Sequence, residues 1–223
     1  MKKGDEEGRV SSGISGFDEL CEGGFAANST NLITGEAGTG KTTFMLQFLY
    51  TGAIVHSERG IFISFGQGAD EINKSANSFG WNLSKVDSSL KFAYINPRKS
   101  LKAIREEIHG LISRSGVKRA CIDCLELVIA DKESEMLEFI LELFDSIRKA
   151  GVISIISYNS KENSNSKELE MIKSLADGVI QLLPSWGDEE TDRALRIVKM
   201  RQTAHSRGHN LFEITDKGMI VYE

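Results

Sequence analysis

The sequence predicts an α/β fold, a mostly parallel, twisted sheet flanked by helices, with an antiparallel extension at its C-terminal end. Short apolar segments alternate with helical patterns over most of the chain. A glycine-rich loop stands between the first of these segments and the first helix. After residue 176, apolar segments follow one another without helices between them, which is typical of antiparallel strands.

The elements follow in a regular order. Residues 29–34 are expected to form a strand before the loop, and residues 43–56 a helix after it. Further parallel strands, each with few polar interruptions, are expected at 60–65, 91–95, 119–123 and 152–157. Other helices are expected at 69–79, 101–112 and 134–149. The strands of the antiparallel extension are expected at 178–183, 193–199, 211–215 and 219–222.

The helix at 134–149 is so apolar that it is either covered by the core or meets a partner chain, and we favour core packing. The 223 residues are expected to form one domain, 1–223. A net charge of −5 argues against a broad nucleic-acid-binding face, but not against a local basic loop. Since neither a secretory signal nor a membrane-spanning run is visible, we expect a cytoplasmic protein without a membrane partner.

The glycine-rich loop matches the phosphate-loop pattern G-x-x-x-x-G-K-[ST] at every fixed position. Glycines let backbone N–H groups turn toward phosphate oxygens, and the N-terminus of the following helix attracts the same anion. The motif predicts that Lys41 reaches nucleotide phosphates and that the Thr42 hydroxyl holds Mg²⁺. A flexible linker, the alternative, leaves the strand and helix on its flanks unexplained. The predicted phosphate-binding residues are Gly35, Glu36, Ala37, Gly38, Thr39, Gly40, Lys41, Thr42 and Thr43.

Asp123 is the expected carboxylate for Mg²⁺, because a phosphate loop needs one at the end of a nearby buried strand. Ligands bind at the carboxyl ends of strands in open α/β sheets. A plain turn-forming aspartate is the alternative. Cys121 and Cys124 form a C-x-x-C pair around the same strand end. We interpret both as reduced, structural thiols rather than a redox or zinc site, because two ligands do not complete a zinc site.

Several segments resemble KaiC-like proteins of the RecA superfamily, in the same order along the chain. SGISGFDEL at 12–20, followed by GGF at 23–25, resembles the family stretch TGIxGLDELLGGG before the phosphate-loop strand. The resemblance implies a RecA-like fold, ATP as the nucleotide, and a homo-oligomeric ring, often hexameric, with each ATP between two subunits. Further resembling segments are SFGW at 78–81, LADGVI at 175–180, LRIVKMR at 195–201 and FEITDKG at 212–218.

In this family a KxR stretch and a following histidine contact the nucleotide of the neighbouring subunit. The resemblance assigns that role to Lys199, Arg201 and His205. A guanidinium suits it, because it offers two donors to a phosphate. The alternative is a surface strand with solvated basic residues. Asn159, near the end of the fourth parallel strand, stands where RecA-type proteins place a γ-phosphate sensor, although a plain loop role is equally compatible.

The chain departs from the family after the second strand, where members that hydrolyse ATP usually carry two glutamates. Gly66 and Gln67 stand there instead. A neutral amide is no useful base near pH 7, although it can orient water. Loss of a general base typically costs about 10²–10⁴ in rate. We therefore expect slow or absent hydrolysis, with Gln67 as the water-orienting residue beside Lys41, and we do not expect Glu71 to substitute.

Three functions are compatible with these residues. The first, which we favour, is a nucleotide-dependent assembly or signalling module whose ATP/ADP state is read by an unidentified protein partner. The second is an active RecA-type ATPase that acts on DNA or as a motor. It needs basic DNA-facing loops, but the charges in and just after the loop 159–166 cancel, so DNA is not expected. The third is a small-molecule kinase, for which no arginine-rich lid is visible.

Overall fold

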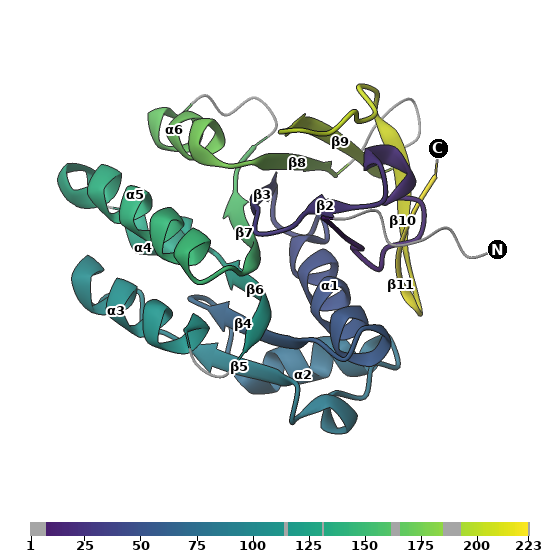
Figure 1. Ribbon diagram of the computed structural model, residues 1–223, viewed down its shortest axis with the longest axis horizontal. Coiled ribbons are helices and arrows are strands. Elements are labelled where there is room, and N and C mark those ends of the chain that lie inside the picture. Colours follow the sequence, from purple (N-terminus) through teal and green to yellow (C-terminus); the bar gives the residue numbers. More distant parts are fainter. Residues whose placement is uncertain (1–7, 114–115, 131, 162–165, 185–192, 223) are drawn as a thin grey trace.

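The computed structural model describes residues 8–113, 116–130, 132–161, 166–184 and 193–222. In these residues nine strands form one sheet, in the order β11-β10-β9-β8-β3-β7-β6-β4-β5, shown in Figure 1. Within this sheet, the first six strands in chain order pair in parallel. They are β3 (Thr30–Gly35), β4 (Arg59–Ser64), β5 (Leu90–Tyr94), β6 (Val117–Asp123), β7 (Ile153–Asn159) and β8 (Gly178–Leu183). The antiparallel extension comprises β9 (Arg193–Met200), β10 (Asn210–Thr215) and β11 (Gly218–Val221).

Helices cover both faces of the sheet (Figure 1). On one face, α1 (Lys41–Val55) and α2 (Ala69–Ser78) pack with the N-terminal segment and the C-terminal strands in one apolar cluster. On the other face, α3 (Leu101–Ile112), α5 (Glu133–Lys149) and α6 (Lys167–Leu175) form a second cluster. The shorter elements are β1 (Arg9–Val10), β2 (Phe25–Ala26), α4 (Glu126–Ile129) and the 3₁₀ turns Glu19–Cys21 and Leu83–Val86. No helix in the described part of the chain is both long and apolar enough to span a membrane.

Local sequence explains where these helices begin and which face they bury. The hydroxyl of Ser100 accepts a hydrogen bond from the N–H of Ala103 at the start of α3, and Ser166 does the same for Leu169 in α6. In α5, most apolar side chains are buried, as core packing requires, but Leu137 and Leu141 remain 51% and 45% exposed. The buried apolar residues of α5 are Met136, Phe139, Ile140, Leu143, Phe144 and Ile147.

The expected fold class is confirmed, and every expected strand or helix lies within two residues of its expected bounds. The expected position of the antiparallel extension was wrong by one strand. We expected it to begin at 178–183, but β8 pairs in parallel with β3, and the antiparallel pairing starts at β9. The helix α6 precedes β8 and was not anticipated, because its buried positions, Leu169 and Ile172, are few among polar neighbours. This helix supplies the crossover that parallel pairing requires.

Helix α1 is held in place by two buried polar side chains. The amide of Gln47 donates to the carbonyls of Gly13 and Met219 and accepts from the N–H of Met219. The guanidinium of Arg119 pairs with Glu58 and donates to the carbonyl oxygens of Ser11 and Phe48, 2.9 Å away in each case. These contacts connect α1 to the N-terminal segment, to β6 and to β11, so they fix the position of the loop that precedes the helix.

Candidate nucleotide-binding site

The phosphate-loop motif forms the turn between β3 and α1. Strand β3 ends at Gly35, and α1 begins at Lys41. Gly40 has a φ of 104°, and a Cβ there would come within 2.7 Å of the side chain of Ile214. Gly35 has a φ of 150°, and a Cβ there would lie 2.5 Å from the carbonyl oxygen of Leu182. Gly35 therefore needs glycine for conformation and for space, and Gly40 needs it for conformation.

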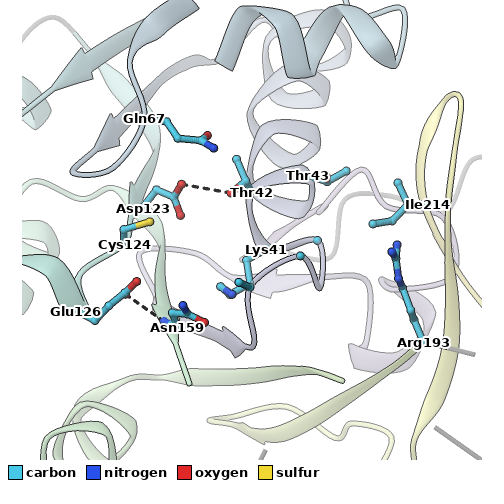
Figure 2. A pocket seen from close by; sticks show the side chains of 13 residues that line it. Lys41, Thr42, Thr43, Gln67, Asp123, Cys124, Glu126, Asn159, Arg193 and Ile214 are labelled. Atoms are coloured by element: carbon cyan, nitrogen blue, oxygen red, sulfur yellow. Dashed lines mark hydrogen bonds between the residues drawn. The ribbon is translucent and has the colours of Figure 1, made fainter. Parts of the chain in front are cut away.

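A cavity of about 490 Å³ opens beside this loop, at the carboxyl edge of the parallel strands. Figure 2 shows side chains from the loop, from the ends of β4, β6 and β7, and from β9 and β10 around it. The predicted site residues that line it are Ala37, Gly38, Gly40, Lys41, Thr42, Thr43, Gln67, Asp123 and Asn159. Gly35, Glu36 and Thr39 belong to the loop but do not line the cavity, and four lining residues were not predicted: Cys124, Glu126, Arg193 and Ile214.

The ammonium of Lys41 is held against its own loop. Its Nζ donates hydrogen bonds of 2.7 Å to the carbonyl oxygens of both Gly35 and Glu36. Burial lowers the pKa of Lys41, and the nearby carboxylates of Glu126 and Asp123 oppose this shift. The side chain therefore brings a partly desolvated positive charge to the cavity wall, the arrangement that favours a polyanionic ligand.

Asp123 and Thr42 lie together at the floor of the cavity. The Thr42 hydroxyl donates to Oδ2 of Asp123 over 3.3 Å, and the Asp123 side chain is almost fully buried. The Ser157 hydroxyl donates to the other carboxylate oxygen, Oδ1, over 2.5 Å. A hydroxyl and a carboxylate are hard oxygen ligands of the kind Mg²⁺ prefers, so these residues fit that ion.

Gln67 leaves a buried acceptor at the cavity wall. Its backbone N–H donates to the Ser64 hydroxyl at 2.8 Å, which holds the turn after β4. Its side-chain oxygen Oε1 is buried and has no hydrogen-bond partner among the described residues. Since buried polar atoms are nearly always paired in proteins, this oxygen is suited to accept from a bound water or ligand. Gly66 contributes no side chain, so neither position offers a carboxylate.

Glu126 lies in the first turn of α4, directly after β6. Its Oε2 accepts a 3.0 Å hydrogen bond from the backbone N–H of Asn159, at the end of β7. Burial raises the pKa of Glu126, the charge of Asp123 acts in the same direction, and hydrogen bonds from backbone N–H groups and the charge of Lys41 oppose the shift. Sequence reasoning missed this residue because no motif marks it; its only signal is its position three residues after Asp123.

Arg193 enters the cavity from the start of β9. Strand β9 runs antiparallel to β8, with Ala194 opposite Leu183, so its first residue lies at the carboxyl edge of β8. Ile214 of β10 lines the same side (Figure 2). The sequence does not reveal this proximity, because it depends on the register between strands that are distant from the loop in sequence.

Of the three residues assigned to a neighbour's nucleotide, Lys199 and Arg201 lie at the opposite ends of the strands from this chain's own loop. The pairing of Met200 with Gly178 puts the end of β9 beside the start of β8. Lys199 Nζ donates to three carbonyl oxygens at the end of α6, the closest being that of Ala176 at 2.7 Å. Burial lowers the pKa of Lys199, and the charge of Arg201 acts in the same direction.

Arg201 and His205 are also engaged within the chain. Arg201 is exposed and forms an ion pair with Asp177 at 3.2 Å. The Nδ1 atom of His205 lies 2.8 Å from the carbonyl oxygen of Ser206. None of the three lines the cavity beside the phosphate loop, so their role at a nucleotide stays a prediction.

The C-x-x-C pair separates into two environments. Cys121 is fully buried, and its thiol lies 3.6 Å from the carbonyl oxygen of Met45. Cys124 is half-buried, with a left-handed φ of 65°, and it lines the cavity. Burial raises the pKa of the Cys124 thiol to about 12. In the described residues, no group of three or more His, Cys, Asp or Glu side chains is arranged to hold a metal ion.

Known proteins resemble this chain along nearly its whole length. A family model described as KaiC, an ATPase, matches residues 10–223. A circadian clock oscillator protein KaiC from Synechococcus elongatus is 29% identical, over 94% of this chain and 43% of that protein. A UPF0273 protein from Thermotoga maritima is 28% identical, over 96% of each chain. The chain thus spans less than half the length of the clock protein that it matches.

A solved structure gives the same result for the fold. The crystal structure of a KaiC-like protein from Pyrococcus horikoshii OT3 superimposes with a TM-score of 0.88 at 33% identity. The match covers 96% of this chain and 99% of that one, so it includes both the parallel strands and the antiparallel extension.

Proposed function

Because this chain belongs to the KaiC family of ATPase domains in the RecA superfamily, we propose that it is a nucleotide-dependent assembly or signalling module. ATP binds between two copies of the chain and holds them together, and a protein partner reads which nucleotide is bound. The observation that carries this proposal is the position of Lys199 and Arg201. They lie at the opposite ends of the strands from their own phosphate loop, so a nucleotide that they contact is one bound by the loop of another copy.

In the proposed site, the backbone N–H groups of residues 35–43 and Lys41 hold the phosphates of ATP. Thr42 and Asp123 would hold Mg²⁺, which would neutralise charge on the phosphates. Lys41 exchanges its two loop carbonyl acceptors for phosphate oxygens, which are stronger partners because they are charged. Asn159 lines the cavity and is the proposed sensor of the γ-phosphate.

Hydrolysis in this site is slow or absent. Gly66 and Gln67 place no carboxylate after β4, and the amide of Gln67 can orient a water molecule but takes no proton from it. Loss of a base costs about 10²–10⁴ in rate. Bound ATP then persists long enough for an assembled state to be read by a partner.

The test is light scattering on the purified chain with and without Mg-ATP, with phosphate release measured on the same sample. The expected result is a higher mass with Mg-ATP and little phosphate released. The Lys41→Ala variant is the control, and its mass should not change with Mg-ATP. Rapid phosphate release by the unaltered chain, or a mass that does not respond to nucleotide, would contradict the proposal.

A further inference from the structure

Two carboxylates of the described residues line the cavity, and only one of them has a role so far. Asp123 is engaged on both oxygens, by Thr42 and by Ser157. Glu126 is the second, on the same wall, and Figure 2 shows Gln67, Asp123 and Glu126 in sequence along that wall, facing the loop. Glu36, within the loop, and Glu71, after β4, do not line the cavity.

The fold holds Glu126 rigidly at this place. The N–H of Leu125, the residue before it, donates to the carbonyl oxygen of Ser157 at 3.1 Å, which fastens the start of α4 to β7. Val128 and Ile129, in the same short helix, are buried in the apolar cluster beneath. The carboxylate is then fixed from the other side by the N–H of Asn159. Because its backbone is anchored to β7 and its carboxylate accepts a hydrogen bond from Asn159, the Glu126 side chain is pre-organised in this position.

Glu126 shares the cavity with the phosphate-binding lysine. Both side chains line it, Glu126 from the start of α4 and Lys41 from the start of α1 (Figure 2). Burial raises the pKa of Glu126 itself, so its carboxylate binds a proton more readily than an exposed one. A carboxylate beside the lysine that receives the γ-phosphate lies near the bond that hydrolysis breaks.

We propose that Glu126 positions the attacking water and accepts its proton in a slow ATP hydrolysis by this chain. The acceptance of the proton is the task that Gly66 and Gln67 cannot perform. This inference rests on the proposed binding of ATP at the phosphate loop. The water oxygen forms a bond to the γ-phosphorus while the bond from that phosphorus to the β–γ bridging oxygen breaks. ADP leaves with the electron pair of that bond. The proton of the water passes to the Glu126 carboxylate and from there to solvent.

The other polar groups of the wall do not fit this task. Both oxygens of Asp123 are occupied, and its place beside Thr42 suits the metal. Gln67 can accept a hydrogen bond from the same water through Oε1 but cannot take the proton.

The test compares Glu126→Gln with the unaltered chain under single-turnover conditions, with protein in excess over radiolabelled ATP. The variant is nearly isosteric and its amide oxygen can still accept from the Asn159 N–H. We expect ATP hydrolysis to slow by about 100-fold or more. We also expect calorimetry to show tighter ATP binding relative to ADP, because a negative charge beside the γ-phosphate is removed. Glu71→Gln, at an exposed carboxylate outside the cavity, is the matched control and should change neither result.

The other outcomes would overturn either the assignment of Glu126 alone or the proposed function with it. Hydrolysis by Glu126→Gln at the rate of the unaltered chain, or no detectable hydrolysis by the unaltered chain, would overturn the assignment while leaving ATP binding intact. Weaker binding of both ATP and ADP by the variant would show a structural role and would also overturn it. Failure of the unaltered chain to bind ATP would instead overturn the proposed function, and the assignment of Glu126 with it.

Discussion

The Ser157 hydroxyl donates a hydrogen bond of 2.5 Å to Oδ1 of Asp123, across the parallel strands β6 and β7. Ser157 Oγ also accepts from the N–H of Cys124 at 2.8 Å, so it is anchored on both sides. This bond turns the other carboxylate oxygen, Oδ2, toward Thr42. The orientation of the proposed metal ligand is therefore set by a residue on a neighbouring strand.

The first prediction concerns this bond. We expect Ser157→Ala to weaken the binding of Mg-ATP by about 10-fold, because groups that orient a metal ligand typically contribute this much to affinity. Calorimetric titration with Mg-ATP measures the effect. Ser154→Ala is the matched control, because its hydroxyl lies buried on the same strand without a hydrogen-bond partner in the described residues. Equal losses in the two variants would rule out an orienting role for Ser157.

The second prediction concerns the missing carboxylates. We expect the double variant Gly66→Glu, Gln67→Glu to hydrolyse ATP about 10²-fold faster than the unaltered chain, because it gains a carboxylate base directly after β4, where Gly66 and Gln67 offer none. The backbone tolerates the change, since a Cβ at Gly66 would meet Cys124 Sγ at 3.4 Å and Leu127 at 3.6 Å. A phosphate-release assay measures the gain. Gly66→Gln is the uncharged control, and a similar gain in that variant would refute the explanation by a base.

The third prediction follows from the raised pKa of Glu126. The folded chain binds the Glu126 proton more tightly than the unfolded chain does, so this group's contribution to stability is fully present below the ordinary value of 4.5 and is lost as pH rises through the raised pKa. Glu126→Gln removes this loss. We expect the variant to be more stable than the unaltered chain at about pH 8, with a smaller difference at about pH 5.

Urea unfolding of both proteins at the two pH values, without nucleotide, measures this difference. Comparing the two proteins at each pH cancels the titration of all the other groups. Glu138→Gln, on the exposed face of α5, provides the comparison variant. A stability gain of Glu126→Gln that is the same at both pH values would show that burial of the charge is not its cause.

The fourth prediction concerns Arg201 and the neighbouring loop. We expect neither Lys41→Ala nor Arg201→Ala alone to assemble with Mg-ATP. In an equal mixture, random association leaves about a quarter of the interfaces with an intact loop facing an intact Arg201. Light scattering should then detect nucleotide-dependent assembly in the mixture. A mixture that assembles with Mg-ATP no more than either variant alone would mean that Arg201 does not act on the nucleotide of another copy.

Much of the nucleotide site can be predicted from the sequence because its chemistry is local. The residues from Gly35 to Thr43 are contiguous, and their glycines and lysine are required by phosphate geometry within one turn. Asp123 can be located because the apolar run of a buried strand ends at it, and ligands bind at the carboxyl ends of such strands. The alternation of apolar strands and helices likewise predicts the fold class, since each element carries its own periodicity.

Other features depend on distances that no single segment specifies. The register of β9 against β8 brings Arg193 to the cavity beside the phosphate loop and puts Lys199 at the opposite end of the strands. The contact between α4 and β7 turns Glu126 into the cavity beside Asn159. The sequence by itself determined the phosphate loop, the carboxylate at the end of β6 and the chain order of the strands in the main sheet, because those follow from local periodicity and turn chemistry. Only the tertiary structure decided which distant side chains share the cavity, because hydrogen bonds and packing between elements set those positions.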